Sequence, residues 1–536
     1  MNKLLFGLVL LISSISSAQE TPKLVVGIVV DQMRYDYLSR YYDDFGEGGF
    51  KRLVDNGFLF RNAHYNYIPT KTGPGHASIY TGTTPSRHGV IGNDWFIPSI
   101  NRNINCVEDT TAAVVGGISN GSVSPRNVRS TTITDELRLF YNFKSRVVGV
   151  SLKDRGAVIP AGHNPTGAYW YDLQSGNMIT STYFAKELPD WVKKYNQEKR
   201  PDYFLSQTWS LLKDEAIYNE SIEDENPYEQ EIRKGMGVSF PYDLSKIKND
   251  PSLLKYTPFT NTMIKEVGIE AIKGENLGQD AIPDFLTLSF SATDDLGHKF
   301  GPRSMEVQDT YLRLDQEISE LLKFLDETVG EDSYTVFLTA DHGATDVPAY
   351  MYKNKMPAGY HNNGYLKSTI AEELSKTYGE DKWVSSIINE QVYLNQKLIL
   401  EKDLNLKEIK EKVIQILLKE DYIYEAFDAE LVAQRMFTDP ILLKLQNGYD
   451  NKRSGDILYI LSSSNLNDSW GRQGTDHRTP YTYDTHIPVI FYGAGVRNGS
   501  TTRPVSITDI APTLSMLLNI ALPSSATGQP LKEIFE

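Results

Sequence analysis

Five short runs of apolar, mostly β-branched residues occur along the chain with little alternation between polar and apolar positions. This pattern is typical of strands that are covered on both faces, because a strand with one wet face alternates. The runs predict strands at residues 23–30, 145–152, 284–290, 334–340 and 487–493. Between the third and fourth runs, apolar residues at helical spacing predict an amphipathic helix within residues 304–330.

Buried strands that alternate with amphipathic helices predict an α/β fold, with a mostly parallel sheet and helices on both of its faces. The 536-residue chain shows no repeat period and no linker rich in Pro, Gly or Ser, so we expect one elaborated domain. Two polar stretches rich in Tyr and Lys, near residues 185–280 and 350–470, are interpreted as insertions that decorate the sheet.

The N-terminus has the features of an export signal. Lys3 precedes an apolar run over residues 4–12, and small residues then lead to Ala18. This order predicts a signal peptide over residues 1–18 and a mature chain over residues 19–536. The alternative is a buried strand, but the terminal position and the small residues favour export, and the run is too short for a permanent membrane anchor.

Cysteine and charge content narrow the compartment and the partners. Cys106 is the only cysteine, so an intramolecular disulfide cannot form. An exported protein of this size without disulfides fits the bacterial periplasm, or secretion from a bacterium, better than an animal secretory pathway. The net charge of −15 argues against a nucleic-acid partner, and after signal cleavage we expect no membrane association and favour a monomer.

Acidic, imidazole and cationic side chains directly follow four of the predicted strands. In chain order these residues are Asp31, Lys153, Arg155, Asp294, His298, Asp341 and His342. Because ligands bind at the carboxyl ends of parallel strands in such sheets, we expect these side chains to collect at one edge. That is the pattern of a site rather than of a core.

Each of these residues also has a purely structural interpretation. An aspartate after a strand is often only a turn or helix cap, and Asp294 and His298, four residues apart, could be a solvated pair on one helix face. Asp341 and His342 are adjacent and point in different directions, so they could serve two neighbouring metal ions or one ion and its surroundings.

A third histidine for this edge comes from the loop GTDHRTPYTYDTHIP, where His477 and His486 are the competing candidates. Three aspartates and three histidines together suit zinc, whereas calcium prefers more oxygen ligands and fewer imidazoles. Two metal ions about 3.5–4 Å apart would form a phosphoryl-transfer site.

The stretch PTKTGPGHASIYTG, residues 69–82, places Thr72 among glycines and a proline just before a predicted helix start. A threonine hydroxyl is common at such a position because it can bond nearby backbone N–H groups. A metal ion at the strand ends would allow the same hydroxyl to act as a nucleophile. The stretch alone leaves both interpretations open.

With these residues identified, the sequence resembles the alkaline phosphatase superfamily, and most of all the phosphate-irrepressible, PafA-type periplasmic alkaline phosphatases. The resemblance runs over nearly the full mature chain, in the order VVGIVVDQMR, PTKTGPGHASIYTG, GNDW, VVGVSLKDR, PAGHNPTGAYW, TDDLGH, TADHGA, the GTDH loop and TDIAPTLS. It implies a three-layer αβα sandwich with a mostly parallel central sheet and large insertions. It also implies a broad-specificity phosphate monoester hydrolase that releases inorganic phosphate.

The resemblance further implies two zinc ions per chain. The ligands that it assigns to one ion are Asp294, His298 and His477. The ligands that it assigns to the other are Asp31, Asp341, His342 and Thr72. Within this scheme Thr72 is the nucleophile that forms a phosphothreonine intermediate, and His486 has a structural role. The residues expected to bind the phosphoryl oxygens are Asn93, Lys153 and Arg155.

Two cations and an amide suit a phosphate monoester, a dianion with three nonbridging oxygens, better than a diester, in which an organic group covers one of them. We therefore expect monoester hydrolysis, with a phosphodiesterase or nucleotide pyrophosphatase as the alternative within the superfamily. A non-catalytic zinc- or phosphate-binding protein is the alternative from a different class. A sulfatase is excluded because it needs a convertible Cys or Ser where this chain has Thr72.

Overall fold

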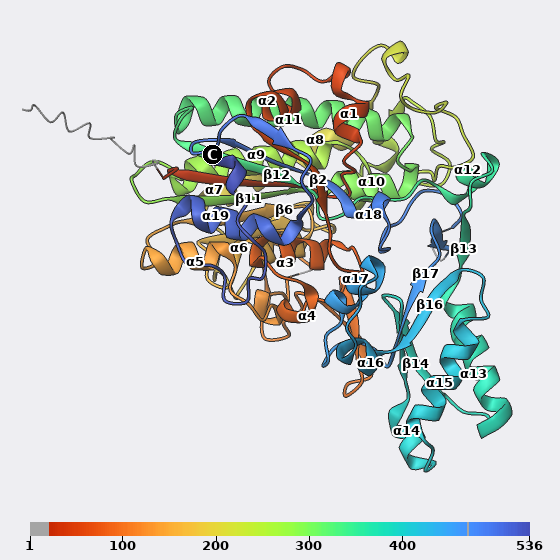
Figure 1. The fold of residues 1–536 in the computed structure, drawn as a ribbon. Helices are drawn as coiled ribbons and strands as arrows, with labels where there is room; N and C mark the ends of the chain where they lie inside the picture. Colours follow the sequence, from red (N-terminus) through yellow and green to blue (C-terminus); the bar gives the residue numbers. More distant parts are fainter. Residues whose placement is uncertain (1–20, 120, 469–470, 536) are drawn as a thin grey trace, which may run out of the picture.

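A large mixed sheet lies between two layers of helices in the computed structural model, which describes residues 21–119, 121–468 and 471–535 (Figure 1). The predicted signal peptide lies outside these described residues. Four neighbouring strands at the centre are parallel, in the order β12 (Tyr334–Thr339), β1 (Leu24–Val30), β11 (Asp284–Phe290) and β6 (Val147–Ser151). All of their residues are buried, which confirms the interpretation of the apolar runs.

Antiparallel strands extend this parallel centre on both sides. β19 (His486–Gly493) runs antiparallel to β12, and β2 (Phe58–His64) runs antiparallel to β19. On the other side β7 (Gly167–Tyr171) is parallel to β6, and β8 (Met178–Ser181) is antiparallel to β7. The sheet is therefore mixed. A run of buried residues shows that a strand is covered on both faces, but it carries no information on strand direction.

Two helical layers cover the faces of the sheet. One contains α9 (Phe259–Glu275) and α11 (Met305–Thr328), and the other contains α3 (Thr72–Thr81) and α6 (Asp154–Ala161). The three layers confirm the αβα sandwich. Part of the first polar stretch contributes to it, because apolar residues of α9 belong to the main core. Among the helices of the described residues, none is both long and apolar enough to cross a membrane.

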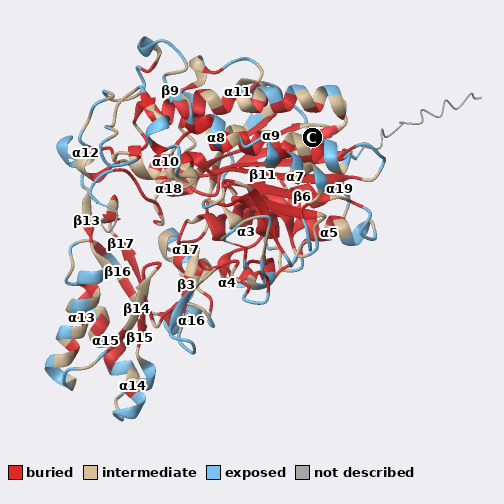
Figure 2. Ribbon diagram, turned by 180° about the vertical axis from the view of Figure 1, so that it is seen from behind, coloured by how far each residue is buried: buried red, intermediate tan, exposed pale blue. Residues whose placement is uncertain are grey.

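A smaller lobe projects from the sandwich and appears in teal and light blue in Figure 1. It has a four-stranded sheet with its own apolar core, in which the two central strands are fully buried (Figure 2). Its strands, in spatial order, are β14 (Val384–Ile388), β15 (Gln391–Leu394), β17 (Ile457–Leu461) and β16 (Ile423–Asp428). Helices α13 (Asn363–Tyr378) and α15 (Leu406–Leu417) pack against this sheet. The lobe lies within the second polar stretch, and the division of the chain into one domain with insertions stays a prediction.

The predicted helix within residues 304–330 begins with an N-cap. The Ser304 side chain accepts a hydrogen bond from the Val307 backbone N–H and donates one to the Gly301 carbonyl. Ser304→Ala removes both bonds, so we expect the free energy of unfolding to fall by about 1 kcal/mol. A lower midpoint of urea unfolding would show it. Ser319→Ala in the middle of the same helix is the control, and an equal loss in both variants would contradict the cap's role.

Candidate active site

The ends of three adjacent strands bring the predicted acidic residues together. Asp31 follows β1, Asp341 lies just beyond β12, and Asp294 lies in α10 (Ala292–Phe300), which begins shortly after β11. These strands are parallel neighbours, so the three carboxylates meet at one edge. Together with three histidines they form two groups whose ligand atoms lie within 4.8 Å of one another in each group. We call Asp294, His298 and His477 site A, and Asp31, Asp341 and His342 site B.

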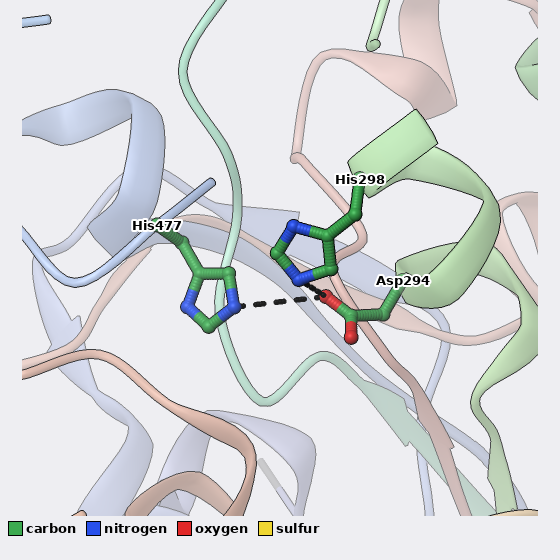
Figure 3. Close-up of side chains that lie close together, drawn as sticks. All are labelled: Asp294, His298 and His477. Atoms are coloured by element: carbon green, nitrogen blue, oxygen red, sulfur yellow. Dashed lines mark ion pairs between the residues drawn. The ribbon is translucent and has the colours of Figure 1, made fainter. Parts of the chain in front are cut away.

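In site A the imidazoles of His298 and His477 lie beside the Asp294 carboxylate (Figure 3), and backbone carbonyls orient both rings. The Nε2 atoms of His298 and His477 lie 3.2 and 3.6 Å from Oδ1 of Asp294. On the other side of each ring, Nδ1 of His298 donates to the Thr475 carbonyl at 2.7 Å, and Nδ1 of His477 donates to the Thr70 carbonyl at 2.6 Å. A proton held on Nδ1 leaves Nε2 free to bind a cation, which is the usual arrangement of metal-binding histidines.

Site B is fully buried and contains polar atoms that have no hydrogen-bond partner among the described residues. They are His342 Nε2, Asp31 Oδ1 and Asp341 Oδ2. The His342 nitrogen lies 3.5 Å from the Asp31 oxygen and 3.7 Å from the Asp341 oxygen, while Nδ1 donates to the Gly343 carbonyl. Buried polar atoms are rarely left unpartnered, and three that converge on one point fit a bound cation.

Burial and neighbouring charges shift the pKa values of the carboxyl and imidazole groups in the two sites. Burial, and then the neighbouring Asp31 carboxylate, raise the pKa of Asp341 well above its usual value. Burial, and then His342, lower the pKa of His477 well below its usual value, so this imidazole is neutral. Burial also acts to lower the pKa of His298, but the Asp294 carboxylate overrides it and raises this pKa to about 9. A metal ion would therefore compete with a proton at His298.

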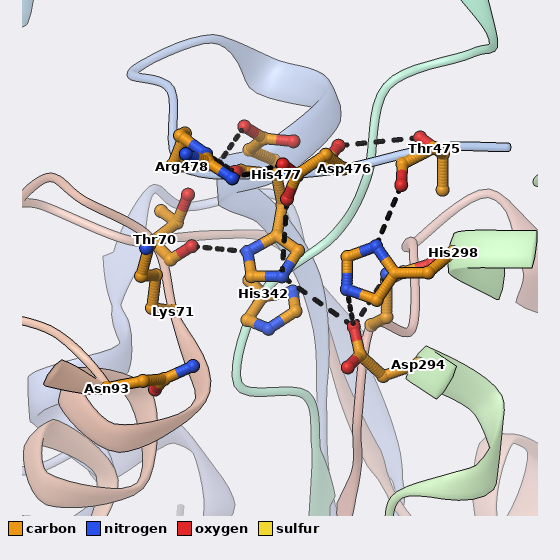
Figure 4. A network of polar contacts seen from close by, with 12 residues as sticks. Thr70, Lys71, Asn93, Asp294, His298, His342, Thr475, Asp476, His477 and Arg478 are labelled. Atoms are coloured by element: carbon orange, nitrogen blue, oxygen red, sulfur yellow. Dashed lines mark hydrogen bonds and ion pairs between the residues drawn. The ribbon is translucent and has the colours of Figure 1, made fainter. Parts of the chain in front are cut away.

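The two sites touch each other. The rings of His342 and His477 stack with their centroids 3.4 Å apart and an interplanar angle of 13° (Figure 4). The Lys153 ammonium donates to Oδ2 of Asp31 at 2.8 Å and also to Oδ2 of Asp294. One cationic side chain thus joins a carboxylate of each site. Sites A and B therefore form one continuous cluster of side chains rather than two separate ones.

Thr72 is the first residue of α3, and the first turn of this helix packs on site B. A Cβ atom on Gly75 would lie 2.5 Å from the Asp341 carbonyl oxygen, so only glycine permits this approach. Nδ1 of His76 donates to the Thr72 carbonyl and lies 3.6 Å from Oδ2 of Asp341. The backbone N–H groups at this helix start favour negative charge beside the Thr72 hydroxyl.

A cavity of about 380 Å³ opens over this arrangement, and its lining includes Thr72, Asn93, Lys153 and Arg155. Oδ1 of Asn93 accepts a hydrogen bond from the Gly73 N–H at 2.7 Å. The carbonyl end of the amide is therefore occupied, and its NH₂ group remains as a donor for a ligand. This bond also ties Asn93 to the helix that begins at Thr72.

Lys153 and Arg155 reach the cavity from the start of a helix. Strand β6 ends at Ser151, so the two residues do not lie on a continuing strand. Lys153 is the N-cap residue of α6, and Arg155 lies in its first turn. Both side chains still line the same cavity, because the strand ends at its edge and the helix begins there.

His486 lies outside both sites. Its Nε2 donates to the Arg61 carbonyl at 3.0 Å, and its ring stacks between those of Tyr35 and His64. Of the two candidates in the GTDH loop, the structure brings only His477 to the strand ends.

Gln32 is a site residue that the sequence did not reveal. It adopts a φ of 64°, a conformation that glutamine rarely takes. Its backbone N–H donates to Oδ1 of Asp341 at 3.1 Å, and its side-chain NH₂ donates to Oδ1 of Asp294 at 2.6 Å. Gln32 therefore holds one carboxylate of each site. In the sequence it is only a polar residue after Asp31, and no local signal marks it.

Lys71 is a second residue that the sequence did not single out. Its ammonium donates to Oδ1 of Asn389, in the turn between β14 and β15, at 2.9 Å. Burial, and then the Arg478 guanidinium, lower its pKa to about 8. Lys71 also lines the cavity, so the smaller lobe contacts the residue that precedes Thr72.

Comparison with known proteins finds relatives that span nearly the whole chain. The model of the type I phosphodiesterase / nucleotide pyrophosphatase family matches residues 25–474. Alkaline phosphatase PafA of Elizabethkingia meningoseptica is 43% identical over 98% of both chains. A Myroides odoratus protein named calcium-transporting ATPase is 41% identical over 97% of this chain and 96% of its own. Alkaline phosphatase PhoV of Synechococcus elongatus is 42% identical over 96% of this chain and 93% of its own.

The fold agrees equally well. The crystal structure of wild-type PafA covers 97% of this chain and 100% of its own, with a TM-score of 0.94 and 42% sequence identity. An αβα sandwich with two adjacent Asp/His sites defines a metalloenzyme class. The chain belongs to the type I phosphodiesterase / nucleotide pyrophosphatase family of the alkaline phosphatase superfamily.

Gln32→Leu should weaken metal binding at site A, because the Asp294 carboxylate loses the side-chain donor that orients it, whereas the backbone donor to Asp341 remains. We expect the affinity for added zinc to fall roughly tenfold or more, as for other residues that orient metal ligands. Competition with a chromogenic chelator measures it. Gln529→Leu, at an exposed glutamine, is the control, and equal zinc affinity in all three proteins would contradict the role of Gln32.

Proposed function

We propose that this protein is an alkaline phosphatase that hydrolyses a broad range of phosphate monoesters, with zinc at sites A and B and Thr72 as the nucleophile. The observation that carries the proposal is that Thr72, at a helix start, lines one cavity together with the site A residues, and that site A lies in contact with site B. From the predicted signal peptide at residues 1–18 we further propose that the enzyme is periplasmic, and we propose separately that it is a monomer.

Two zinc ions per chain fit the residues of the two sites. The donors are mixed carboxylates and imidazoles, and the free imidazole nitrogens and carboxylate oxygens of each site converge. When bound, zinc supplies a lower pKa for the Thr72 hydroxyl and stabilises negative charge on the leaving oxygen.

The chain's own residues account for two displacements at phosphorus. The Thr72 oxygen forms a bond to phosphorus while the ester P–O bond breaks, and the alcohol leaves. Water then attacks the phosphothreonine, the bond to the Thr72 oxygen breaks, and inorganic phosphate is released. The helix start at Thr72 favours the negative charge of the phosphoryl group in both steps.

Asn93, Lys153 and Arg155 are proposed to hold the nonbridging oxygens. Arg155 offers two parallel donors and Lys153 a compact charge, while Asn93 has a free NH₂ group. Three donors match the three nonbridging oxygens of a monoester. The names of the PafA and PhoV relatives agree with this substrate class. ATP hydrolysis, which the name of the Myroides relative describes, also removes a terminal phosphoryl group with three nonbridging oxygens.

Turnover of p-nitrophenyl phosphate should require both zinc and the Thr72 hydroxyl. Removal of metal by a chelator should abolish activity, and added zinc should restore it. Thr72→Ala should lower kcat roughly a thousandfold or more, because it removes the nucleophile. Metal analysis should still find two zinc ions per chain of this variant, which separates loss of chemistry from loss of metal.

Thr72→Ser is the matched control, since it keeps a hydroxyl at the same position, and it should retain activity within roughly tenfold of the parent. Full activity of Thr72→Ala would overturn the assignment of the nucleophile. Phosphate binding without turnover in the zinc-loaded parent would instead favour the non-catalytic alternative.

Arg155→Met should discriminate between monoesters and diesters. The variant loses contacts to nonbridging oxygens that a diester partly lacks, so kcat/KM for p-nitrophenyl phosphate should fall at least roughly tenfold more than that for the bis-ester. Steady-state kinetics on both substrates measure the ratio. A parent enzyme that prefers the bis-ester, or an equal loss on both substrates, would refute the assignment of Arg155 to a monoester phosphoryl group.

A further inference from the structure

The active-site cavity extends beyond the residues assigned to metal and phosphoryl binding. Its lining also includes Lys255, Tyr256 and Lys299. Lys255 and Tyr256 end the 3-10 helix η5 (Pro251–Tyr256), and Lys299 lies near the end of α10. None of the three belongs to site A or site B, and none is needed for the chemistry at Thr72.

The two lysines converge on one aromatic ring. The Lys255 ammonium lies 4.8 Å and the Lys299 ammonium 4.4 Å from the centroid of the Tyr256 ring. A cation is attracted to the electron-rich face of such a ring, so Tyr256 holds both ammonium groups in place. The ring thereby keeps two like charges close together at the cavity wall.

The positive charge of this pair is only partly compensated. Lys255 forms an ion pair with Asp295 at 3.2 Å, and the same carboxylate lies 4.0 Å from the Lys153 ammonium. Lys299 donates to the Glu231 backbone carbonyl at 3.1 Å, and no carboxylate of the described residues lies within ion-pair distance of it. In a chain of net charge −15, this local excess of positive charge fits an anionic ligand.

The pair lies beside site A. Lys299 directly follows the site A ligand His298, and Asp295, the partner of Lys255, directly follows Asp294. In the proposed reaction Thr72 attacks from site B, and the leaving oxygen lies opposite it, on the side of site A. A group attached to that oxygen therefore extends toward this side. Lys153 and Arg155 have a different proposed role, because they bind the phosphoryl group that is transferred and not the leaving group.

There is room here for a leaving group of some size. A second cavity of about 260 Å³ shares Lys153, Arg155, Lys255 and Asp295 with the first. The aromatic and apolar part of its lining consists of Leu152, Trp170, Tyr171 and Leu173. An apolar or aromatic leaving group can pack along this wall while an anionic substituent meets the two ammonium groups.

We propose that Lys255, Lys299 and Tyr256 form a leaving-group subsite for a second anionic group, a carboxylate or a phosphate. Among phosphate monoesters, the enzyme then favours those whose alcohol carries such a group. This inference rests on the proposed function, because it assumes hydrolysis at Thr72. The inference goes beyond the proposed function because it assigns to these three residues the selection among different monoesters.

A matched pair of substrates tests the subsite. In meta-carboxyphenyl phosphate the leaving group carries a negative charge, whereas meta-carbamoylphenyl phosphate carries a neutral amide of nearly the same shape. We expect a higher kcat/KM for the carboxylate in the parent enzyme. Lys299→Gln should lower the ratio of the two kcat/KM values about fivefold, and the double variant with Lys255→Gln should bring it close to one. High salt should also lower the ratio in the parent.

Lys234→Gln is the control, because this exposed lysine lies outside the lining of the active-site cavity, and it should leave the ratio unchanged. Lys255→Gln also removes an ion pair to Asp295 and could disturb site A. Such a disturbance lowers kcat/KM for both substrates alike, so it cancels in the ratio of the two values. Equal kcat/KM for the two substrates in the parent, or a preference that survives in the double variant, would overturn the subsite alone. Failure of the zinc-loaded parent to hydrolyse either substrate would overturn the proposed function as well.

Discussion

The structure depends on one electrostatic constraint, the convergence of three buried carboxylates at the ends of adjacent parallel strands. Asp31, Asp294 and Asp341 are at most 4% exposed, and charged groups so far from water are costly unless cations compensate them. The Lys153 ammonium compensates part of this charge by its contacts to Asp31 and Asp294. The imidazoles around the carboxylates complete two sites that suit divalent cations.

The elements around the strand ends are shaped by this constraint. Histidine Nδ1 atoms face backbone carbonyls, so the opposite nitrogens remain available as ligands. Gln32 takes a left-handed conformation and thereby donates to a carboxylate of each site. Gly75 allows the first turn of α3, the helix that begins at Thr72, to approach Asp341 closely. The chemistry proposed for Thr72 follows from a helix start placed on a cation site.

Much of this arrangement could be predicted from the sequence. Buried strands are recognisable in the sequence as unbroken apolar runs. Ligands bind at the carboxyl ends of parallel strands, so the residues that follow each run were the candidates for the site. Asp294 and His298 illustrate the rule, because their spacing on a helix places both at site A. The motif order then indicated the family, which the comparisons confirm.

Other features could not be predicted because they depend on tertiary contacts. The direction of β19 is set by its neighbours and not by its apolar content. The position of Gln32 depends on a backbone conformation that its residue type does not favour. Lys255 and Lys299 are 44 residues apart in the sequence, and only the fold brings both to the Tyr256 ring.

The central claim is that Thr72 accepts the phosphoryl group before water does. The stereochemical course at phosphorus tests it most directly, with a monoester whose phosphoryl group is made chiral by oxygen isotopes and with transfer to an alcohol acceptor. Two successive displacements predict net retention of configuration. Net inversion would show a single direct displacement, and it would contradict a phosphothreonine intermediate.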